Sequence, residues 1–252
     1  MSQTKGLDHT TATWLDVDLA DAAANLALDE ALLEAAEEGR LAAPVARIWT
    51  AAETTVVLGS SSRIADEVDL DACTASAARL VRRPTGGLTV LLGPGCLMWS
   101  MVVPHPGGPP AIEAIHAAML EPLAAALRSA GRPVERRGTS DLALVGGDVE
   151  RKVSGNALRV RRAAVLYHGT LLDAFDLGAV SRLLRHPPRE PGYRAGRSHG
   201  AFLANLGLGG DALAALVRRA FGAAAAAGDW PRDRVAALVA ERYACDAWTR
   251  RL

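Results

Sequence analysis

The sequence is poor in several features that define common classes of protein. Basic and acidic residues number 28 each, so no excess of charge indicates a nucleic-acid or anionic-membrane partner. The three cysteines, Cys73, Cys96 and Cys245, are spaced for neither a disulfide framework nor a metal-ligand cluster. The N-terminus lacks the pattern of a signal peptide, and the longest apolar run, 88–103, is interrupted at 93–95 by Gly-Pro-Gly. We therefore expect a cytoplasmic protein with no nucleic-acid partner and no membrane association.

Lysine is almost absent, which draws attention to one position. Only Lys5 and Lys152 interrupt a basic set that is otherwise arginine, and Lys152 lies four residues before Asn156, one of three asparagines. An ammonium is a compact point charge that can lie between two anions, whereas a guanidinium is a broad planar fork. Lys152 is therefore either a surface lysine retained by chance or a position where arginine would not serve.

The pattern of hydrophobic residues predicts a globular fold of mixed type. The chain has 252 residues, of which 50% are hydrophobic and 22% charged, enough for a substantial core. Periodicity predicts helices over 20–38, 66–79, 111–130, 177–185, 211–222 and 231–248, and the Ala-rich stretch 223–227 also favours a helix. Apolar runs predict strands within 47–58 and at 80–83, 88–92, 97–104, 141–145, 149–153 and 164–167. This order predicts an α/β (α+β) fold with one mixed, mainly antiparallel sheet flanked by helices.

Four polar clusters are candidates for a site. Residues 82–87, Arg-Arg-Pro-Thr-Gly-Gly, combine bidentate donors with a closely approachable backbone, although a hairpin turn with a solvated arginine pair also fits. Residues 152–157, Lys-Val-Ser-Gly-Asn-Ala, bring a cation, a hydroxyl and an amide within a short reach. His168-Gly169-Thr170 ends a strand, where a structural histidine is the usual explanation, and the polar loop 193–199 is either a gate over a site or plain surface.

The order of the motifs is more specific than any one of them. The motifs are Asn25–Glu30, Thr55–Gly59, the 82–87 turn, Gly138–Leu142 with its Gly-Thr-Ser-Asp-Leu sequence, the Lys152 cluster and His168–Leu172. This succession resembles the lipoate–protein ligase A / octanoyltransferase catalytic-domain family, from about residue 20 to about 178. The resemblance implies a fold similar to class II aminoacyl-tRNA synthetases and biotin ligases. It also implies one catalytic domain over 1–252, with a helical C-terminal extension over about 205–252, since that tail is short for a separate domain.

The resemblance further implies which residues act. Lys152 matches the family's motif lysine and would be catalytic, contacting the acyl carboxyl oxygen and the α-phosphate. Asp141 would lie near ATP and its Mg²⁺, with no permanent metal site in the protein. The other residues implied to bind the acyl substrate or its adenylate are Arg83, Thr85, Gly86, Gly87, Ser154, Gly155, Asn156, Ala157, His168 and Thr170.

The chain also departs from the family's pattern. Leu88 stands where the family usually has a third glycine and Leu92 where it has a histidine, which bears on adenylate binding. Octanoyltransferases of this fold pass the acyl chain through a cysteine thioester, yet the two regions that carry this cysteine, here 138–141 and 181–190, contain none. Cys96, near the glycine turn, is either a buried inert thiol or a thiolate. The missing cysteine favours a ligase.

Three functions follow from these observations. The first is a lipoate or octanoate–protein ligase that uses ATP and Mg²⁺ to acylate a lysine on a lipoyl domain. That domain would belong to a 2-oxoacid dehydrogenase subunit or the glycine-cleavage H protein, and the reaction would draw on a separate accessory-domain protein if the short tail cannot complete it. The second is an ATP-independent acyltransferase that takes octanoyl or lipoyl from a carrier protein. The third, kept open by Leu88 and Leu92, is a catalytically silent protein that binds lipoyl domains or an acyl ligand.

Overall fold

The computed structural model describes residues 7, 12–108, 110–222 and 228–252. The Ala-rich stretch 223–227, which the sequence predicts to favour a helix, lies outside these residues.

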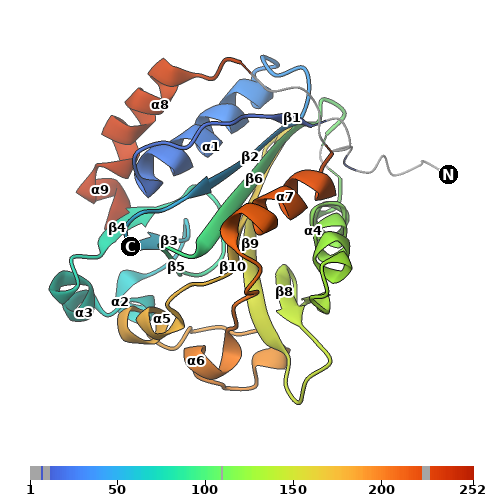
Figure 1. The fold of residues 1–252 in the computed structure, drawn as a ribbon. Helices are drawn as coiled ribbons and strands as arrows, with labels where there is room; N and C mark the ends of the chain where they lie inside the picture. The colour runs from blue at the N-terminus through green and yellow to red at the C-terminus, as the bar shows by residue number, and fades with distance from the viewer. Residues whose placement is uncertain (1–6, 8–11, 109, 223–227) are drawn as a thin grey trace.

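A seven-stranded sheet runs through the middle of the molecule (Figure 1). Its order is β1-β2-β6-β10-β9-β8-β7, in which only β1 and β2 pair in parallel, so the mixed and mainly antiparallel sheet is confirmed. The strands are β1 (Thr13–Trp14), β2 (Val45–Thr50), β6 (Cys96–Pro104), β7 (Val134–Arg137), β8 (Asp141–Leu144), β9 (Arg151–Val160) and β10 (Ala164–Leu172).

A second, smaller sheet stands beside the predicted one. The strands β3 (Thr55–Leu58), β4 (Arg79–Arg82) and β5 (Val90–Leu92) form a separate three-stranded sheet in the order β4-β3-β5. The reason is that β1 and β6 occupy both edges of β2, so the strand that follows β2 along the chain has no free edge there. The second sheet consequently lies against the first and carries the 82–87 turn between β4 and β5.

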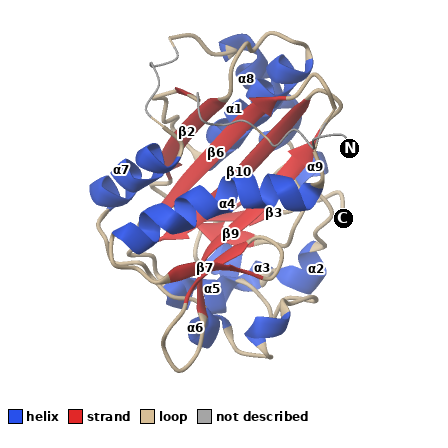
Figure 2. Ribbon diagram, turned by 90° about the vertical axis from the view of Figure 1, so that its right-hand side faces the viewer, coloured by secondary structure: helices blue, strands red, loops and turns tan. Residues whose placement is uncertain are grey.

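Helices cover both faces of the large sheet (Figures 1 and 2). The longer ones are α1 (Ala22–Glu37), α4 (Ile112–Ser129) and α7 (Gly210–Ala220). The shorter ones are α2 (Ile64–Glu67), α3 (Leu70–Ala75), α5 (Leu177–Leu183), the 3₁₀ turn η1 (Gly192–Arg194), α6 (His199–Phe202), α8 (Arg232–Leu238), the π turn η2 (Val239–Tyr243) and α9 (Asp246–Thr249). Helices α1 and α8 pack on one face, and α4 and α7 on the other.

Strand β6 shows how the two faces become two cores. Met98 and Val102 join the core beneath α1, whereas Trp99, Met101 and Val103 join the core beneath α4 and α7. A strand buried on both faces reads as a continuous apolar run because no position along it meets water. The 97–104 run of the sequence is therefore the central strand of the molecule.

Two predicted helices are interrupted. The 66–79 segment forms α2 and α3, because Val68 is extended and bridges to Leu184, and the Asp69 side chain then caps α3 by accepting a hydrogen bond from the Ala72 amide at 2.9 Å. The 231–248 segment forms α8, the π turn and α9, since the backbone at Cys245 is extended. In the described residues, no helix combines the length and the apolar character needed to cross a bilayer.

Candidate active site

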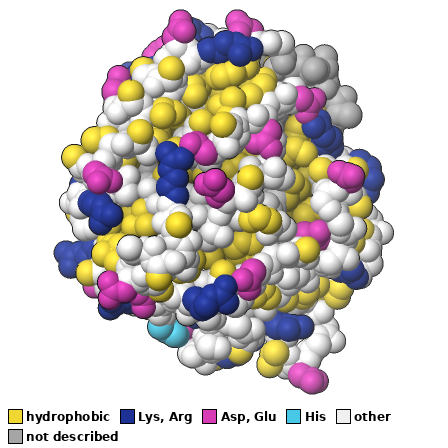
Figure 3. Space-filling view, turned by 60° about the vertical axis from the view of Figure 1, so that its left-hand side comes forward, with side chains coloured by type: hydrophobic (Ala, Val, Ile, Leu, Met, Phe, Trp, Pro, Cys, Tyr) yellow, Lys and Arg dark blue, Asp and Glu magenta, His cyan; other side chains and the backbone are white. Residues whose placement is uncertain are grey.

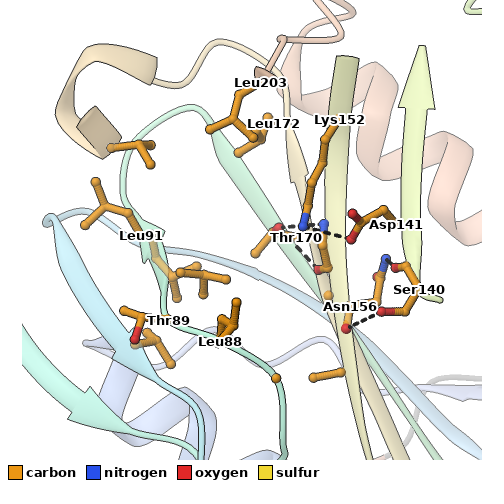
Figure 4. Close-up of a pocket in the computed structure, with 18 of the residues that line it drawn as sticks. Leu88, Thr89, Leu91, Ser140, Asp141, Lys152, Asn156, Thr170, Leu172 and Leu203 are labelled. Atoms are coloured by element: carbon orange, nitrogen blue, oxygen red, sulfur yellow. Dashed lines mark hydrogen bonds and ion pairs between the residues drawn. The ribbon is translucent and has the colours of Figure 1, made fainter. Parts of the chain in front are cut away.

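A cavity of about 460 Å³ lies between the small sheet and the end of the large one, within the usual size range of small-molecule sites. Figure 4 shows its two sides: Leu91 of β5, with Leu88 two residues before that strand, faces Lys152, Asp141 and Asn156 from β8 and β9. The apolar part of the lining consists of Leu26, Trp49, Val57, Leu88, Val90, Leu91, Leu92, Met98, Trp99, Leu172, Phe175, Val180, Leu184, Phe202 and Leu203. One wall is thus suited to a hydrocarbon chain and the other to a polar head.

Lys152 is the charged centre of the polar wall. Its Nζ lies 2.8 Å from Asp141 Oδ1, and the Tyr193 hydroxyl donates a hydrogen bond to Asp141 Oδ2 at 2.9 Å. Burial and the neighbouring Asp141 carboxylate raise the pKa of Tyr193, so its hydroxyl stays protonated and remains a donor. An ammonium has three N–H donors and the ion pair uses one, which leaves two for a ligand.

Gly155 provides the space in which the ammonium lies. A Cβ built on Gly155 would stand 2.9 Å from Lys152 Nζ and 3.0 Å from its Cε, closer than ordinary contact. Within the 152–157 motif, the missing side chain of Gly155 therefore leaves room for the end of the Lys152 side chain.

The carbonyls of the 84–88 turn meet donors from several segments. Pro84 accepts a hydrogen bond from Arg159, Thr85 from the Ser60 amide, and Gly86 and Leu88 from Arg83, while the Gly87 carbonyl lies 3.4 Å from the Ser62 hydroxyl. In a trans peptide the N–H points opposite to the C=O. Each of the Gly86, Gly87 and Leu88 amides therefore points away from the donor that meets the preceding carbonyl.

Arg82 and Arg83 are not a solvated pair, so that alternative was wrong. Both side chains are buried, and all four hydrogen bonds of Arg83 go to the turn or to the adjacent strand β3, including one from Nε to the Thr85 hydroxyl at 2.9 Å. Burial lowers the pKa of Arg83 to about 10, which still leaves the guanidinium charged at neutral pH. Arg83 holds the turn in shape, and its guanidinium also reaches the cavity wall.

A buried chain of hydrogen bonds runs beneath the turn. His168 Nε2 lies 2.7 Å from Thr85 Oγ1 and its Nδ1 lies 3.2 Å from Asp29 Oδ2, while Asp29 Oδ1 pairs with Arg47 at 2.8 Å. Burial alone would raise the pKa of Asp29, but the charge of Arg47 and the hydrogen bond from His168 outweigh it and the pKa falls below its ordinary 3.8. The Asp29 carboxylate accepts a hydrogen bond from Nδ1–H of His168. In the neutral imidazole, Nε2 therefore accepts a hydrogen bond from the Thr85 hydroxyl.

The hydrogen-bonded series Thr85–His168–Asp29 has the order of a nucleophilic triad, but the position of Thr85 indicates that the series supports the turn. Thr85 is fully buried, already accepts the Arg83 bond and does not line the cavity, whereas His168 does. The network therefore fixes the turn to β10 and α1. Sequence reasoning placed Asp29 only within a motif and missed Arg47, although a carboxylate on the apolar face of a helix, three residues after Leu26 and four before Leu33, is itself a signal.

The remaining candidate residues divide into two groups. Lining the cavity are Arg83, Gly87, Asp141, Lys152, Gly155, Asn156, Ala157, His168 and Thr170. Ser154 lies behind the cavity, fully buried, and accepts a hydrogen bond from the side-chain amide of Asn156 at 3.0 Å. Gly86 lies in the turn beside the cavity. The 193–199 loop contributes Arg194, His199 and the Tyr193 contact with Asp141, so its surface-only interpretation does not hold.

The three cysteines lie away from the cavity. Cys96 begins β6 within the core, and burial raises the pKa of its thiol to about 12. Cys73 and Cys245 line a separate cleft between α3 and α9 that shares no lining residue with the cavity. The Cys96 thiol, with a pKa of about 12, is therefore not a thiolate at neutral pH.

Metal ligands and surface charge add little to the site. Over the described part of the chain, no three His, Cys, Asp or Glu side chains are grouped to hold a metal ion. Acidic and basic side chains are interspersed over the face seen in Figure 3, in keeping with their equal numbers. The positive charge of the site comes from side chains that line the cavity, among them Lys152, Arg83 and Arg194.

Comparison with known proteins places this geometry in a family. Residues 21–208 match the family described as the lipoyl protein ligase A/B catalytic domain. Octanoyltransferase LipM of Carboxydothermus hydrogenoformans is 31% identical over 189 residues, which cover 69% of this chain and 70% of the relative. The putative lipoate-protein ligase A of Aeropyrum pernix is 31% identical over 160 residues, which cover 64% of this chain and 57% of the relative.

Solved structures share the fold. A bi-partite lipoate protein ligase from Thermoplasma acidophilum superimposes with a TM-score of 0.81 at 22% identity, over 96% of this chain and 97% of the other. A lipoate-protein ligase A bound with ATP gives a TM-score of 0.76 at 24% identity, over 95% of this chain and 98% of the other. The architecture is therefore the class II synthetase-like fold of the lipoate ligases. The chain belongs to the lipoyl protein ligase A/B family, whose members named above are acyl-transferring enzymes.

Proposed function

We propose that this chain is an ATP-dependent lipoate or octanoate–protein ligase. The carrying observation is the position of the cysteines: none lines the cavity, and the thiol of Cys96 is buried with a raised pKa. An acyl chain in the cavity has no thiolate with which to form a thioester, whereas a route through an acyl-adenylate needs no nucleophilic side chain.

In the first step, a carboxylate oxygen of the acid attacks the α-phosphorus of ATP. The new bond gives the acyl-adenylate, and the bond to the leaving pyrophosphate breaks. Negative charge builds on the phosphoryl oxygens, and fixed donors that meet this charge lower the barrier. Lys152, with two N–H groups beyond its bond to Asp141, and the amides of the 84–88 turn supply such donors.

In the second step, the amine of a lysine on the acceptor protein attacks the acyl carbonyl and AMP leaves. Lys152 polarises the carbonyl oxygen as charge develops on it. The apolar wall suits an unbranched chain of medium length, and one structure of the same fold is a lipoate protein ligase with bound lipoic acid.

The groups that the reaction requires have matching partners at the site. The Lys152 ammonium and the backbone amides of the 84–88 turn fit the phosphates of ATP. The described residues form no metal cage, and both Asp141 oxygens already have partners, so a Mg²⁺ ion would arrive on the nucleotide, as Mg²⁺ commonly binds through substrate phosphates.

The acceptor in this proposal is a lipoyl domain. The Thermoplasma ligase is described as bi-partite and occurs with its E2 lipoyl domain. We extend both features to this chain: its acceptors would be lipoyl domains of 2-oxoacid dehydrogenase subunits or the H protein, and an accessory-domain protein would assist it.

A second candidate is an ATP-independent octanoyl or lipoyl transferase. It is favoured by the relatives that are named octanoyltransferase LipM, at 31% identity. Such an enzyme would need a nucleophile that the cavity does not present as a cysteine.

A cysteine-free variant separates the two functions. We expect Cys73→Ala, Cys96→Ala and Cys245→Ser together to keep acid-dependent ATP–pyrophosphate exchange within about twofold of the unaltered protein, because no thiol touches the cavity. Transfer from an octanoyl carrier protein without ATP, abolished in the cysteine-free variant, would instead establish the transferase and overturn the proposal.

A further inference from the structure

The last described segment of the chain is bonded to the strand that precedes the glycine turn. The Trp248 indole donates a hydrogen bond to the Arg82 carbonyl at 3.0 Å, and Arg82 Nε donates to the Thr249 carbonyl at 3.0 Å. Arg82 is fully buried. Two such bonds in opposite directions hold α9 and β4 in one register.

Arg82 and Arg251 connect this segment to the loop at 59–62. Arg82 Nη1 donates to the carbonyls of Gly59 at 2.7 Å and Ser62 at 2.8 Å, and Arg251 Nη2 donates to the Ser60 carbonyl at 2.7 Å. Three carbonyls of one short loop are therefore held by two arginines.

The 59–62 loop in turn supports the 84–88 turn. The Ser60 amide donates to the Thr85 carbonyl at 2.8 Å, and the Ser62 hydroxyl lies 3.4 Å from the Gly87 carbonyl and 3.0 Å from Glu67 Oε2. A Cβ on Gly59 would lie 1.9 Å from the Gly87 oxygen, so the two backbones touch. Displacement of the loop would therefore displace the turn.

The other end of the segment is anchored on α1. The Tyr243 hydroxyl donates to Glu30 Oε2 at 2.8 Å, and Arg242 forms an ion pair with the same carboxylate. The guanidinium groups of Arg242 and Arg251 both lie over the Trp248 ring, at 5.0 Å and 3.7 Å from its centroid. Residues 242–252 thus span from α1 to the loop at 59–62.

We propose that residues 242–252 brace the 84–88 turn, so that Arg82 and Trp248 are positioning residues for nucleotide binding. None of residues 242–252 lines the cavity, so the brace reaches the cavity only through the turn, of which Gly87 and Leu88 line it. The nucleotide readout rests on the ligase function proposed above, whereas the brace itself is a statement about backbone order that needs no ATP.

The test removes one donor and keeps the ring. Trp248→Phe deletes the indole N–H that meets the Arg82 carbonyl, and Trp230→Phe, in the segment before α8 with its ring under Arg232, is the matched control. We expect faster hydrogen exchange at the Ser60 amide, whose partner is Thr85. In pyrophosphate exchange we expect the KM for ATP to rise about 5- to 20-fold, the effect of losing one buried hydrogen bond, and the KM for octanoate to rise by less, because only Gly87 and Leu88 of the turn line the cavity.

Each outcome decides between the ideas. Unchanged exchange at Ser60, or an equal rise of both KM values, overturns the brace. Absence of ATP-dependent exchange in the unaltered protein counts against the ligase function, and the Ser60 amide then still decides the brace. Should Trp248→Phe fold poorly, Arg251→Met is the second variant, because Arg251 is exposed and donates to the Ser60 carbonyl. It is expected to show the same faster exchange at the Ser60 amide and the same larger rise in the KM for ATP.

Discussion

The substitution Gly155→Ala tests whether the position of the Lys152 ammonium controls the reaction. The new Cβ would stand 2.9 Å from Nζ, so the ammonium must retreat by about 0.5–1 Å to reach an ordinary contact of 3.4–4 Å. A misplacement of about 1 Å at a reacting centre costs on the order of 10²-fold in rate. That factor corresponds to about 2.7 kcal/mol of transition-state free energy.

The fold should tolerate this change. The group that must move is the end of a flexible side chain, at about 0.5–1.5 kcal/mol for a strained rotamer, and replacing a strand glycine returns about 0.5–1 kcal/mol. For a chain of this size the expected change in Tm is within about 4 °C. Acyl transfer should therefore fall about 30- to 100-fold in a protein that melts normally.

Two controls make the result interpretable. Gly210→Ala, at the start of α7, meets nothing within 4 Å and should be silent in both assays. In a Lys152→Ala background, adding Gly155→Ala should cause no further loss, because the group that it displaces is gone. Full activity in Gly155→Ala, or an undiminished further loss in the double variant, would refute the argument.

Two other substitutions test the surroundings of the site. Tyr193→Phe removes the donor to Asp141 and should lower the turnover rate about fivefold, the effect of about 1 kcal/mol, without changing the KM for the acid; a change in that KM alone would contradict this role. Asp29→Asn leaves the buried Arg47 without its counter-charge and should destabilise the protein by about 3–5 kcal/mol at pH 7. Because the pKa of Asp29 is depressed in the folded state, its contribution is full above pH 3.8 and is lost as the pH falls through the folded-state pKa, so the difference in Tm between the two proteins should narrow in acid; a constant difference would count against the assignment.

Local patterns predicted the elements better than their partners. The scarcity of lysine in the whole chain singled out Lys152, and apolar runs marked the strands within 47–58 and at 80–83, because both can be read without knowing which segments pack together. The three-stranded sheet could not be read in the same way, since strand pairing depends on which edges are already occupied.

The sequence could not predict the hydrogen bonds beneath the 84–88 turn, because they too depend on which segments pack together. Asp29, Thr85 and His168 come from three distant segments and meet only when α1, the turn and β10 pack together. Composition also misled at Arg82 and Arg83: arginines are usually solvated, but here both are buried and donate hydrogen bonds to backbone carbonyls of neighbouring loops. The predicted C-terminal helix is interrupted at Cys245, where the backbone is extended. Trp248 in the helix α9 that follows then contacts β4 through its hydrogen bond to the Arg82 carbonyl.

The central claim is that this chain activates a free acid with ATP. The most direct measurement is the intact mass of an unmodified lipoyl domain after incubation with the protein and an octanoate–lipoate mixture, with and without ATP–Mg²⁺, with an accessory-domain protein added in a parallel pair of tubes. The account predicts a gain of one octanoyl or lipoyl group only where ATP is present, and its loss on Lys152→Ala. A gain from an octanoyl carrier protein in the absence of ATP, or no gain from any donor, would contradict it.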